Sequence, residues 1–199
     1  MSAPASSARP RKRYATKPSS SGGNSSTSAA GGGSSSSAAG GGSKPTLEIG
    51  VQGPLSGDNQ ALGLNIEWGV KLAVQQANAK GDLPFTLAIK EGDDQGTQDK
   101  GADAANLLIQ DKSVIGVVGP AFSGPTAASG ALYTAANLVE VSPSATRPSL
   151  TSSGYKTFYR VVANDSVQGR TAADYIAKTL KATKAFVVDD KTQYGTGLS

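Results

Sequence analysis

Short apolar segments that lead into loops with hydroxyl side chains most constrain the fold of this chain. The clearest is residues 114–118, Val-Ile-Gly-Val-Val, which is apolar except at Gly116 and precedes the loop that carries Ser123. This pattern is typical of a central parallel strand covered by helices on both faces. Similar segments lead into residues 141–146 and 190–195. Because ligands bind at the carboxyl ends of strands in open parallel sheets, these loops predict a pocket for a small polar molecule.

Helical and strand patterns alternate along the chain after residue 46. Thr97 is a plausible N-cap, Gly81 is placed to end the first helix, and Asn164 begins a capping signal for the last one. This order predicts an α/β fold with a doubly wound parallel sheet. The predicted strands are residues 47–52, 85–89, 114–118, 138–141, 156–162 and 185–188, and the predicted helices are residues 60–80, 98–111, 123–137 and 167–180.

Residues 1–45 differ in composition from the rest of the chain. They contain six basic residues and no acidic one, so of the formal net charge of +4 they contribute +6 and residues 46–199 contribute −2. A basic globular surface for nucleic acid is therefore not expected. Residues 19–43 are Ser, Gly, Ala, Thr and one Asn only. With no large apolar side chain to bury, they are expected to form a disordered tether.

The basic run at residues 9–13, Arg-Pro-Arg-Lys-Arg, resembles the charged start of a secretory signal. No apolar stretch of about 7–15 residues follows it, so it does not meet the criterion for a signal peptide. A basic arm for nuclear import or for nucleic acid is one interpretation of such a run. We favour a solvated tail or a wrongly assigned start, because short charge runs are usually solvated.

The composition argues against several kinds of chemistry. The chain has no cysteine and no histidine, so thiol chemistry, the commonest general base and the commonest metal ligand are all missing. The sequence contains neither a glycine-rich phosphate loop nor a G-x-S-x-G nucleophile elbow. No apolar run approaches the roughly 18 residues of a transmembrane helix. We therefore expect no catalysis, no cofactor and no bound metal.

Three residues are candidates for ligand contact, and each has a plainer alternative. Ser123 lies near a helix start, where backbone N–H groups attract a carboxylate or a phosphate, or it merely caps its own helix. Thr146 and the carbonyl groups of its loop could accept hydrogen bonds from an ammonium group, or the loop is an ordinary turn. Tyr194 could cover an apolar ligand with its ring, or it is a surface tyrosine.

Two further features have structural interpretations. The acidic pair Asp93 and Asp94 could bind a hard cation, but without further spaced oxygen ligands we expect a solvated loop near a helix start. Trp68 lies on the first predicted helix, where an aromatic side chain is more often in the core or in other packing than in contact with ligand.

The chain from about Leu47 to Ser199 resembles the type I periplasmic binding proteins of the leucine/isoleucine/valine-binding branch, the solute receptors of ABC importers. Each motif is modest alone, but their order is specific. The motifs are residues 47–57 (Leu-Glu-Ile-Gly-Val-Gln-Gly-Pro-Leu-Ser-Gly), 74–81, 93–94, 118–123 (Val-Gly-Pro-Ala-Phe-Ser), 142–146 (Ser-Pro-Ser-Ala-Thr), 154–155, 158–160, 165–169 and 190–195 (Asp-Lys-Thr-Gln-Tyr-Gly).

The resemblance implies two α/β lobes that are joined by a hinge and close on a ligand. Residues 46–163 would form the N-terminal ligand-binding lobe, and residues 164–199 the hinge crossover and the incomplete start of the second lobe. By the same resemblance, Ser123 holds the α-carboxylate of the ligand, with Ala121 among the binding residues. Ser144 (through its backbone) and Thr146 hold the carboxylate and ammonium ends, and Tyr194 closes over the ligand from the second lobe.

This chain departs from the family pattern in three respects. Leu62 occupies the position of a family aromatic that flanks the ligand side chain, so the preferred side chain is open. The acidic residue that pairs with the ammonium would lie beyond Ser199, where a helix should cover the last predicted strand. We therefore expect an N-terminal fragment with half a cleft and weak or absent affinity. Related lipoproteins also carry an apolar signal and a lipid-bearing cysteine before such a tether, and this sequence has neither.

The expected function is that of an extracytoplasmic component of an ABC importer, either periplasmic or at the cell surface. It would bind a small amino acid, of branched-chain type, and present it to the permease subunits, without nucleic acid. Contact with a membrane would come only through a lipid anchor that this sequence lacks. A ligand-sensing receptor or regulator domain on the same fold is the alternative, and an open α/β enzyme is the least favoured reading.

Overall fold

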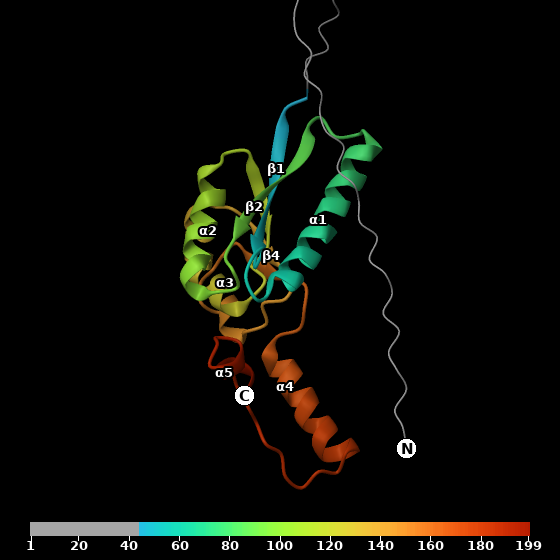
Figure 1. Cartoon of the computed structure of the whole chain (residues 1–199), viewed down its shortest axis with the longest axis vertical. Helices are drawn as coiled ribbons and strands as arrows, with labels where there is room; N and C mark the ends of the chain where they lie inside the picture. Colours follow the sequence, from blue (N-terminus) through green and yellow to red (C-terminus); the bar gives the residue numbers. More distant parts are fainter. Residues whose placement is uncertain (1–43) are drawn as a thin grey trace, which may run out of the picture. The chain divides into compact units, whose positions relative to one another are not determined.

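The computed structural model describes residues 44–199, so the predicted tether and the basic run lie outside the described residues. A five-stranded parallel sheet with the order β2-β1-β3-β4-β5 forms the centre (Figure 1). The expected α/β architecture with a parallel sheet is confirmed. The strands are β1 (Thr46–Gly53), β2 (Thr86–Asp93), β3 (Val114–Val118), β4 (Glu140–Ser142) and β5 (Phe158–Arg160).

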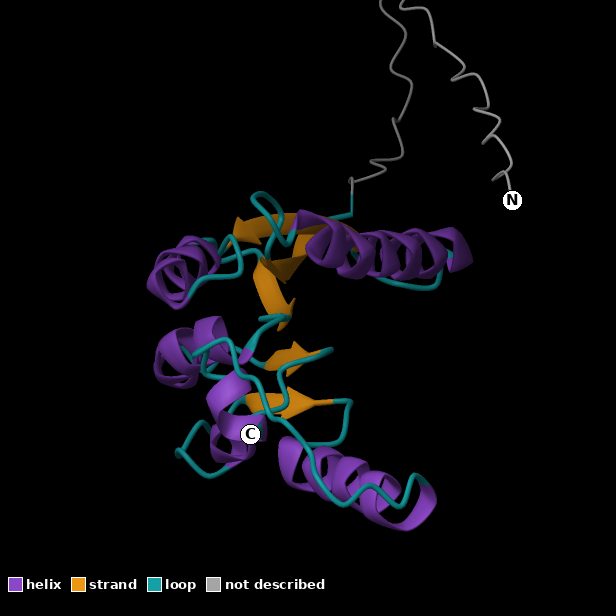
Figure 2. Cartoon of the chain, turned by 60° about the horizontal axis from the view of Figure 1, so that its bottom comes forward, coloured by secondary structure: helices purple, strands orange, loops and turns teal. Residues whose placement is uncertain are grey.

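Helices lie on both faces of this sheet. Helix α1 (Gln60–Lys80) covers one face, and α2 (Gln98–Gln110) and α3 (Ser123–Ala135) pack together on the other (Figures 1 and 2). A short 3₁₀ turn, η1 (Pro148–Thr151), precedes β5, and α4 (Asp165–Asp174) follows it. Since every strand is parallel, the carboxyl ends of the strands meet at one edge of the sheet, where the functional loops are found.

Local sequence signals account for several helix ends. Gly81 ends α1 with a left-handed backbone (φ 71°) that glycine adopts without a steric penalty. The Asn164 side chain caps α4 by accepting a hydrogen bond from the Val167 N–H at 3.3 Å. Thr97 stands at the N-cap position of α2, as expected, but its side chain makes no capping bond. Its hydroxyl donates instead to the Asp94 carbonyl at 3.4 Å.

Two apolar clusters form the core of the lobe. The larger joins β3 to α2 and α3, and the smaller joins β5, η1 and the loop after β4. They consist of Ala105, Leu108, Val114, Val117 and Tyr133, and of Ala145, Leu150 and Phe158. The second cluster includes Ala145 from the loop after β4, so packing of the core helps to hold that loop in place.

Three expectations about burial and secondary structure were wrong. Ile115 is 47% exposed, so β3 is central in the sheet without being covered on both faces along its whole length. Trp68 is 60% exposed and does not pack in the core. Residues 185–188 form no strand, and Phe186 is 92% exposed, because no neighbouring strand pairs with this segment.

The C-terminal part also differs in detail from the prediction. The helix expected at residues 167–180 is α4 followed by a π-helical turn, η2 (Tyr175–Thr179), and the last element is the short α5 (Gly195–Leu198). The strand expected at residues 156–162 is limited to the three residues of β5. Within residues 44–199, no helix combines the length and the apolar character needed to cross a membrane.

Candidate functional site

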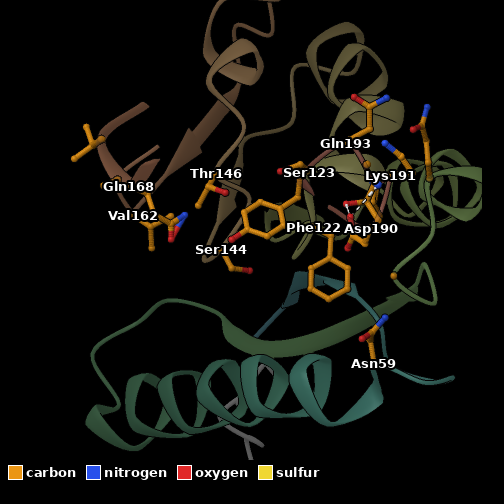
Figure 3. Close-up of a pocket in the computed structure, with 18 of the residues that line it drawn as sticks. Asn59, Phe122, Ser123, Ser144, Thr146, Val162, Gln168, Asp190, Lys191 and Gln193 are labelled. Carbon is orange, nitrogen blue, oxygen red and sulfur yellow. Dashed lines mark hydrogen bonds between the residues drawn. The ribbon is translucent and has the colours of Figure 1, made fainter. Parts of the chain in front are cut away.

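A cavity of about 1230 Å³ lies at the carboxyl edge of the sheet (Figure 3). Its walls come from the loops after all five strands, from one side of α4 and from residues 190–194. Of the residues predicted to bind ligand, Ser123, Ser144, Thr146 and Tyr194 all line this one cavity. The volume exceeds the roughly 300–1,000 Å³ of typical small-molecule sites, so a small ligand would touch only part of the wall.

Ser123 is the first residue of α3 and is almost fully buried, with 1% of its surface exposed. The N-cap position of α3 is held by Phe122, so Ser123 does not occupy the capping position, which argues against the capping alternative. Instead its hydroxyl oxygen accepts a hydrogen bond from the Arg147 N–H at 3.3 Å, which ties the loop after β3 to the loop after β4. The first N–H groups of a helix lack intrahelical acceptors and carry partial positive charge, so this corner suits a carboxylate.

Hydrogen bonds also fasten the loop that carries Ser144 and Thr146. The Ser144 hydroxyl donates to the Ala121 carbonyl at 2.6 Å, and the Ser142 hydroxyl donates to the Pro120 carbonyl at the same distance. On the other side, the Arg160 guanidinium donates to the Arg147 carbonyl at 2.8 Å. The loop is therefore held from two directions and is not an ordinary free turn.

The Thr146 hydroxyl lines the cavity and has no hydrogen-bond partner among the described residues. Its oxygen is buried and makes no hydrogen bond with any other described residue. A buried hydroxyl without a partner costs about 1–3 kcal/mol, so such groups call for an explanation. Because Thr146 lines the cavity, a polar group of a ligand is a suitable partner.

Tyr194 belongs to a compact C-terminal turn that lines the cavity close to the start of α3, where Gln193 comes near Gly124. The Asp190 carboxylate accepts hydrogen bonds from the Thr192 N–H at 3.0 Å and from its hydroxyl at 2.7 Å, which holds the turn in shape. The Lys191 ammonium pairs with Asp189 at 3.1 Å. Both charged residues of the turn that line the cavity thus have partners within the turn itself, and Tyr194 is 39% exposed.

Two predicted site residues do not line the cavity. Ala121 is fully buried and reaches the site only through its carbonyl, which accepts from Ser144. Leu62 lies on the first turns of α1 and is 52% exposed. Its side chain is therefore not part of the cavity wall.

Phe122, Asn59 and Gln98 also line the cavity, although they were not among the residues predicted to bind ligand. Phe122 could have been noticed, because a large apolar residue directly before a helix start occupies a position that Ser, Thr, Asp and Asn usually hold. Asn59 and Gln98 precede or begin helices, and their sequence context carries no comparable signal.

The acidic pair Asp93 and Asp94 lies near the start of α2, as predicted. The prediction that both residues are solvated was wrong, because Asp94 is buried. Asp94 is fully buried, and this burial raises its pKa to about 6, against hydrogen bonds from the Gly96 N–H and from Gln52. Gln52 also accepts a bond of 2.6 Å from the Tyr133 hydroxyl, which links β1 to α3.

Asp93 fastens the loop after β1 to the loop after β2. Burial opposes its ionisation, but the hydrogen bonds from Ser56, Gln95 and Leu55 outweigh burial and lower its pKa. Among residues 44–199, no three acidic side chains come together as metal ligands would.

These features define a class: an α/β lobe that presents hydroxyl groups and a helix N-terminus at the carboxyl edge of a parallel sheet. The sequence model of the periplasmic binding protein family matches residues 46–199, and the chain belongs to this family. The fold is accordingly that of the type I periplasmic binding proteins, which confirms the resemblance drawn from the sequence.

Similar proteins carry the names of amino-acid-binding proteins. The amino acid binding protein of Pseudomonas aeruginosa is 33% identical over 152 residues, which are 76% of this chain and 41% of that protein. Leu/Ile/Val-binding protein homolog 1 of Brucella melitensis is 34% identical over the same shares of the two chains. This chain thus spans about two fifths of the length of the curated relatives that it matches.

Solved structures of substrate-binding proteins are also similar to this chain. The branched-chain amino acid transporter substrate binding protein LivJ from Streptococcus pneumoniae, in complex with isoleucine, has a TM-score of 0.71 and 32% identity. That match covers 77% of this chain and 44% of LivJ. An ABC transporter substrate-binding protein from Desulfitobacterium hafniense, in complex with Leu, has a TM-score of 0.64 and 28% identity over the same shares.

Proposed function

We propose that this chain is the N-terminal ligand-binding lobe, with the start of a second lobe, of a solute-binding protein that serves an amino-acid ABC importer. One observation carries the proposal. The start of α3 at Ser123, which suits an anion, and the Thr146 hydroxyl, which has no hydrogen-bond partner among the described residues, come from neighbouring loops and line the same cavity. An α-amino acid carries an anionic and a cationic group on adjacent carbon atoms, so it needs such a pair of sites.

In this proposal the ligand is bound without being changed. Its carboxylate accepts hydrogen bonds from the first N–H groups of α3 and from Ser123. Its ammonium donates to Thr146 and to carbonyl groups of the loop that contains Ser144. Tyr194 covers the ligand with its ring, while Ala121 acts through its carbonyl by holding Ser144 in place.

The lobe boundaries are part of the proposal. Residues 46–163 would form the first lobe, and the chain would cross a hinge at residues 164–165 into the second. Ligand would favour the closed arrangement only through contacts that the open arrangement lacks. Because residues 164–199 supply only a small part of a second lobe, we expect binding by this chain to be weak. Leu62 would reach a ligand only at the rim of the cleft.

The chemistry of the wall supports a small apolar amino acid, and the names of the relatives point to the branched-chain class. A solute-binding protein of this kind acts outside the cytoplasm and delivers its ligand to the permease subunits of the importer. We infer that catalysis is absent, because the chain contains neither histidine nor cysteine and its cavity has no nucleophile paired with a base.

A titration with a panel of L-amino acids, followed by ¹⁵N–¹H NMR at millimolar ligand, tests this function. We expect saturable shifts with leucine, isoleucine or valine at the amides near Ser123 and Thr146. Ser123→Ala and Thr146→Val should each weaken binding about tenfold or more, since each removes a hydrogen bond to a charged group. Ser166→Ala and Thr179→Val, which alter exposed hydroxyl groups on the α4–η2 segment, serve as matched controls. The absence of shifts across the whole panel would contradict the proposal.

A further inference from the structure

Arg160, the last residue of β5, donates hydrogen bonds on both sides of Thr146 in the loop after β4. One guanidinium nitrogen, Nη1, lies 3.3 Å from the Ala145 carbonyl oxygen and 2.8 Å from the Arg147 carbonyl oxygen. The other, Nη2, donates to the Thr151 hydroxyl at 3.0 Å. The planar guanidinium presents its N–H groups in a rigid fork, so it fixes several acceptors at once, which a single ammonium group does not.

The carbonyl groups of residues 145–147 all accept hydrogen bonds from within the lobe. Arg160 donates to the first and the third, and the Asp165 N–H donates to the Thr146 carbonyl at 3.0 Å. The Thr146 hydroxyl is buried, lines the cavity and has no partner among the described residues. The loop therefore turns these carbonyl groups toward Arg160 and Asp165, and it leaves the hydroxyl for a ligand.

The guanidinium of Arg160 is itself held in a half-buried position. Burial lowers the pKa of Arg160, and the charge of the Asp165 carboxylate opposes this effect. The group lies over the ring of Phe158, 5.9 Å from the ring centroid, and Phe158 belongs to the smaller core cluster. A charge withdrawn from water requires paired N–H groups. The side chain is thus fixed against the core, and the loop is fixed against the side chain.

We propose that Arg160 is a positioning residue for the ammonium half of the site: by holding the peptide groups on both sides of Thr146, it turns the Thr146 hydroxyl toward the ligand. The inference rests on the proposed function. Arg160 does not line the cavity, so it acts only through the loop. The start of α3 at Ser123 stays in place when the loop shifts. Loss of the guanidinium should therefore affect ligands with an ammonium group and spare ligands without one.

The first test compares two ligands that differ in the ammonium group. ¹⁵N–¹H NMR titrations with leucine and with 4-methylpentanoate, its deaminated analogue, are carried out on the wild-type chain, on Arg160→Lys and on Arg170→Lys. The last variant makes the same change at an exposed arginine of α4 outside the cavity wall. We expect Arg160→Lys to weaken leucine about fivefold or more and 4-methylpentanoate by less than about twofold, and the control to change neither. Equal weakening of both ligands, or no weakening, would overturn the inference.

A double-mutant cycle tests whether Arg160 acts through Thr146. In a Thr146→Val background no hydroxyl is left to be positioned, so Arg160→Lys should weaken leucine by less than about twofold further. A purely structural role for Arg160 predicts instead that the two effects multiply in full. That result would count against the proposal.

Hydrogen exchange without ligand separates this inference from the proposed function. The amides of Arg147 and Asp165 should exchange about tenfold faster in Arg160→Lys, because their hydrogen bonds depend on the position of the loop. The amides of β1 and β3 should keep their protection, which shows that the lobe stays folded. Unchanged exchange at both amides would mean that Arg160 does not hold the loop. If the wild-type chain binds no amino acid, the proposed function fails, and the exchange rates still decide whether Arg160 positions Thr146.

Discussion

Glu140, at the start of β4, is a carboxyl group buried in the lobe without a partner. It has no exposed surface, and neither of its carboxylate oxygens forms a hydrogen bond with another described residue. Burial raises its pKa to about 8. At neutral pH the protonated form therefore dominates, since a buried unpaired carboxylate is much more costly than a neutral acid. Asp94 is buried in the same lobe, with its pKa raised less far.

The stability of the lobe should fall as the pH rises. Both carboxyl groups bind protons more tightly in the folded state than in the unfolded chain, where they titrate near 4 to 4.5. The stabilisation is thus complete below about pH 4 and is lost as the pH passes through about 6 for Asp94 and about 8 for Glu140. At about 1.4 kcal/mol per pKa unit, Glu140 alone accounts for roughly 5 kcal/mol or less. Urea unfolding at pH 5 and at pH 8.5 measures the difference.

Glu140→Gln isolates this effect, because glutamine has a similar shape and cannot ionise. We expect the variant to be more stable than the wild type at pH 8.5 and to lose much of the dependence on pH. Asp82→Asn, which changes an exposed carboxylate, is the control and should leave the slope as it is. An unchanged slope in Glu140→Gln would show that this carboxyl is not responsible.

At the scale of elements, α1 contains two glycines with opposite surroundings. A Cβ atom at Gly63 would lie 2.1 Å from the Pro54 carbonyl oxygen, so the helix can approach the end of β1 only because this residue is glycine. A Cβ atom at Gly69 would meet nothing within 4 Å. Alanine has a better helix propensity than glycine by about 1 kcal/mol at both positions, so only the packing differs.

Alanine at these two positions should therefore have effects of opposite sign. Gly69→Ala should increase the free energy of unfolding by about 0.5–1 kcal/mol. Gly63→Ala should decrease it by about 2 kcal/mol or more, because the backbone of α1 must move away from Pro54. Chemical denaturation of both variants measures the pair, and each is the control for the other. Two changes of the same sign would refute this account of the contact between α1 and β1.

At the scale of the whole molecule, residues 185–188 stand out as an apolar segment that is exposed and unpaired within the described chain. Their sequence, Ala-Phe-Val-Val, has strong strand propensity, yet Phe186, Val187 and Val188 are 92%, 68% and 78% exposed. Exposed apolar segments that pair with no other strand favour association between chains. This segment contrasts with β1 to β5, where each strand has a parallel neighbour.

Self-association of this chain should therefore depend on residues 185–188. We expect the apparent mass in sedimentation experiments to rise with concentration, and Val187→Lys to suppress the rise by placing a charge in the segment. Ala182→Lys adds the same charge at an exposed position outside the segment and should have little effect. Equal suppression by both variants would show that net charge, and not the segment, controls association.

Part of this structure could be predicted because the signals are local. The bounds of α1 and β3 agree with the prediction at both ends, and α3 begins at Ser123 as expected. Periodicity, Gly81 and the apolar run of β3 act within a few residues of the chain, so they can be read without knowledge of the fold. The convergence of Ser123, Ser144 and Thr146 on one cavity follows from the parallel order of the strands, which the alternating pattern also predicts; Tyr194 follows no strand of this sheet.

The tertiary structure alone decided which side chains are buried and which reach the cavity. Asp94 is buried because Gln52 and Tyr133, which are 81 residues apart, meet beside it, and Phe122 enters the cavity because Gly96 leaves room for its ring. Trp68 is 60% exposed because no other segment within residues 44–199 packs over that side of α1. Burial and hydrogen bonding depend on neighbours supplied by distant segments, and a sequence pattern specifies an element without specifying its neighbours.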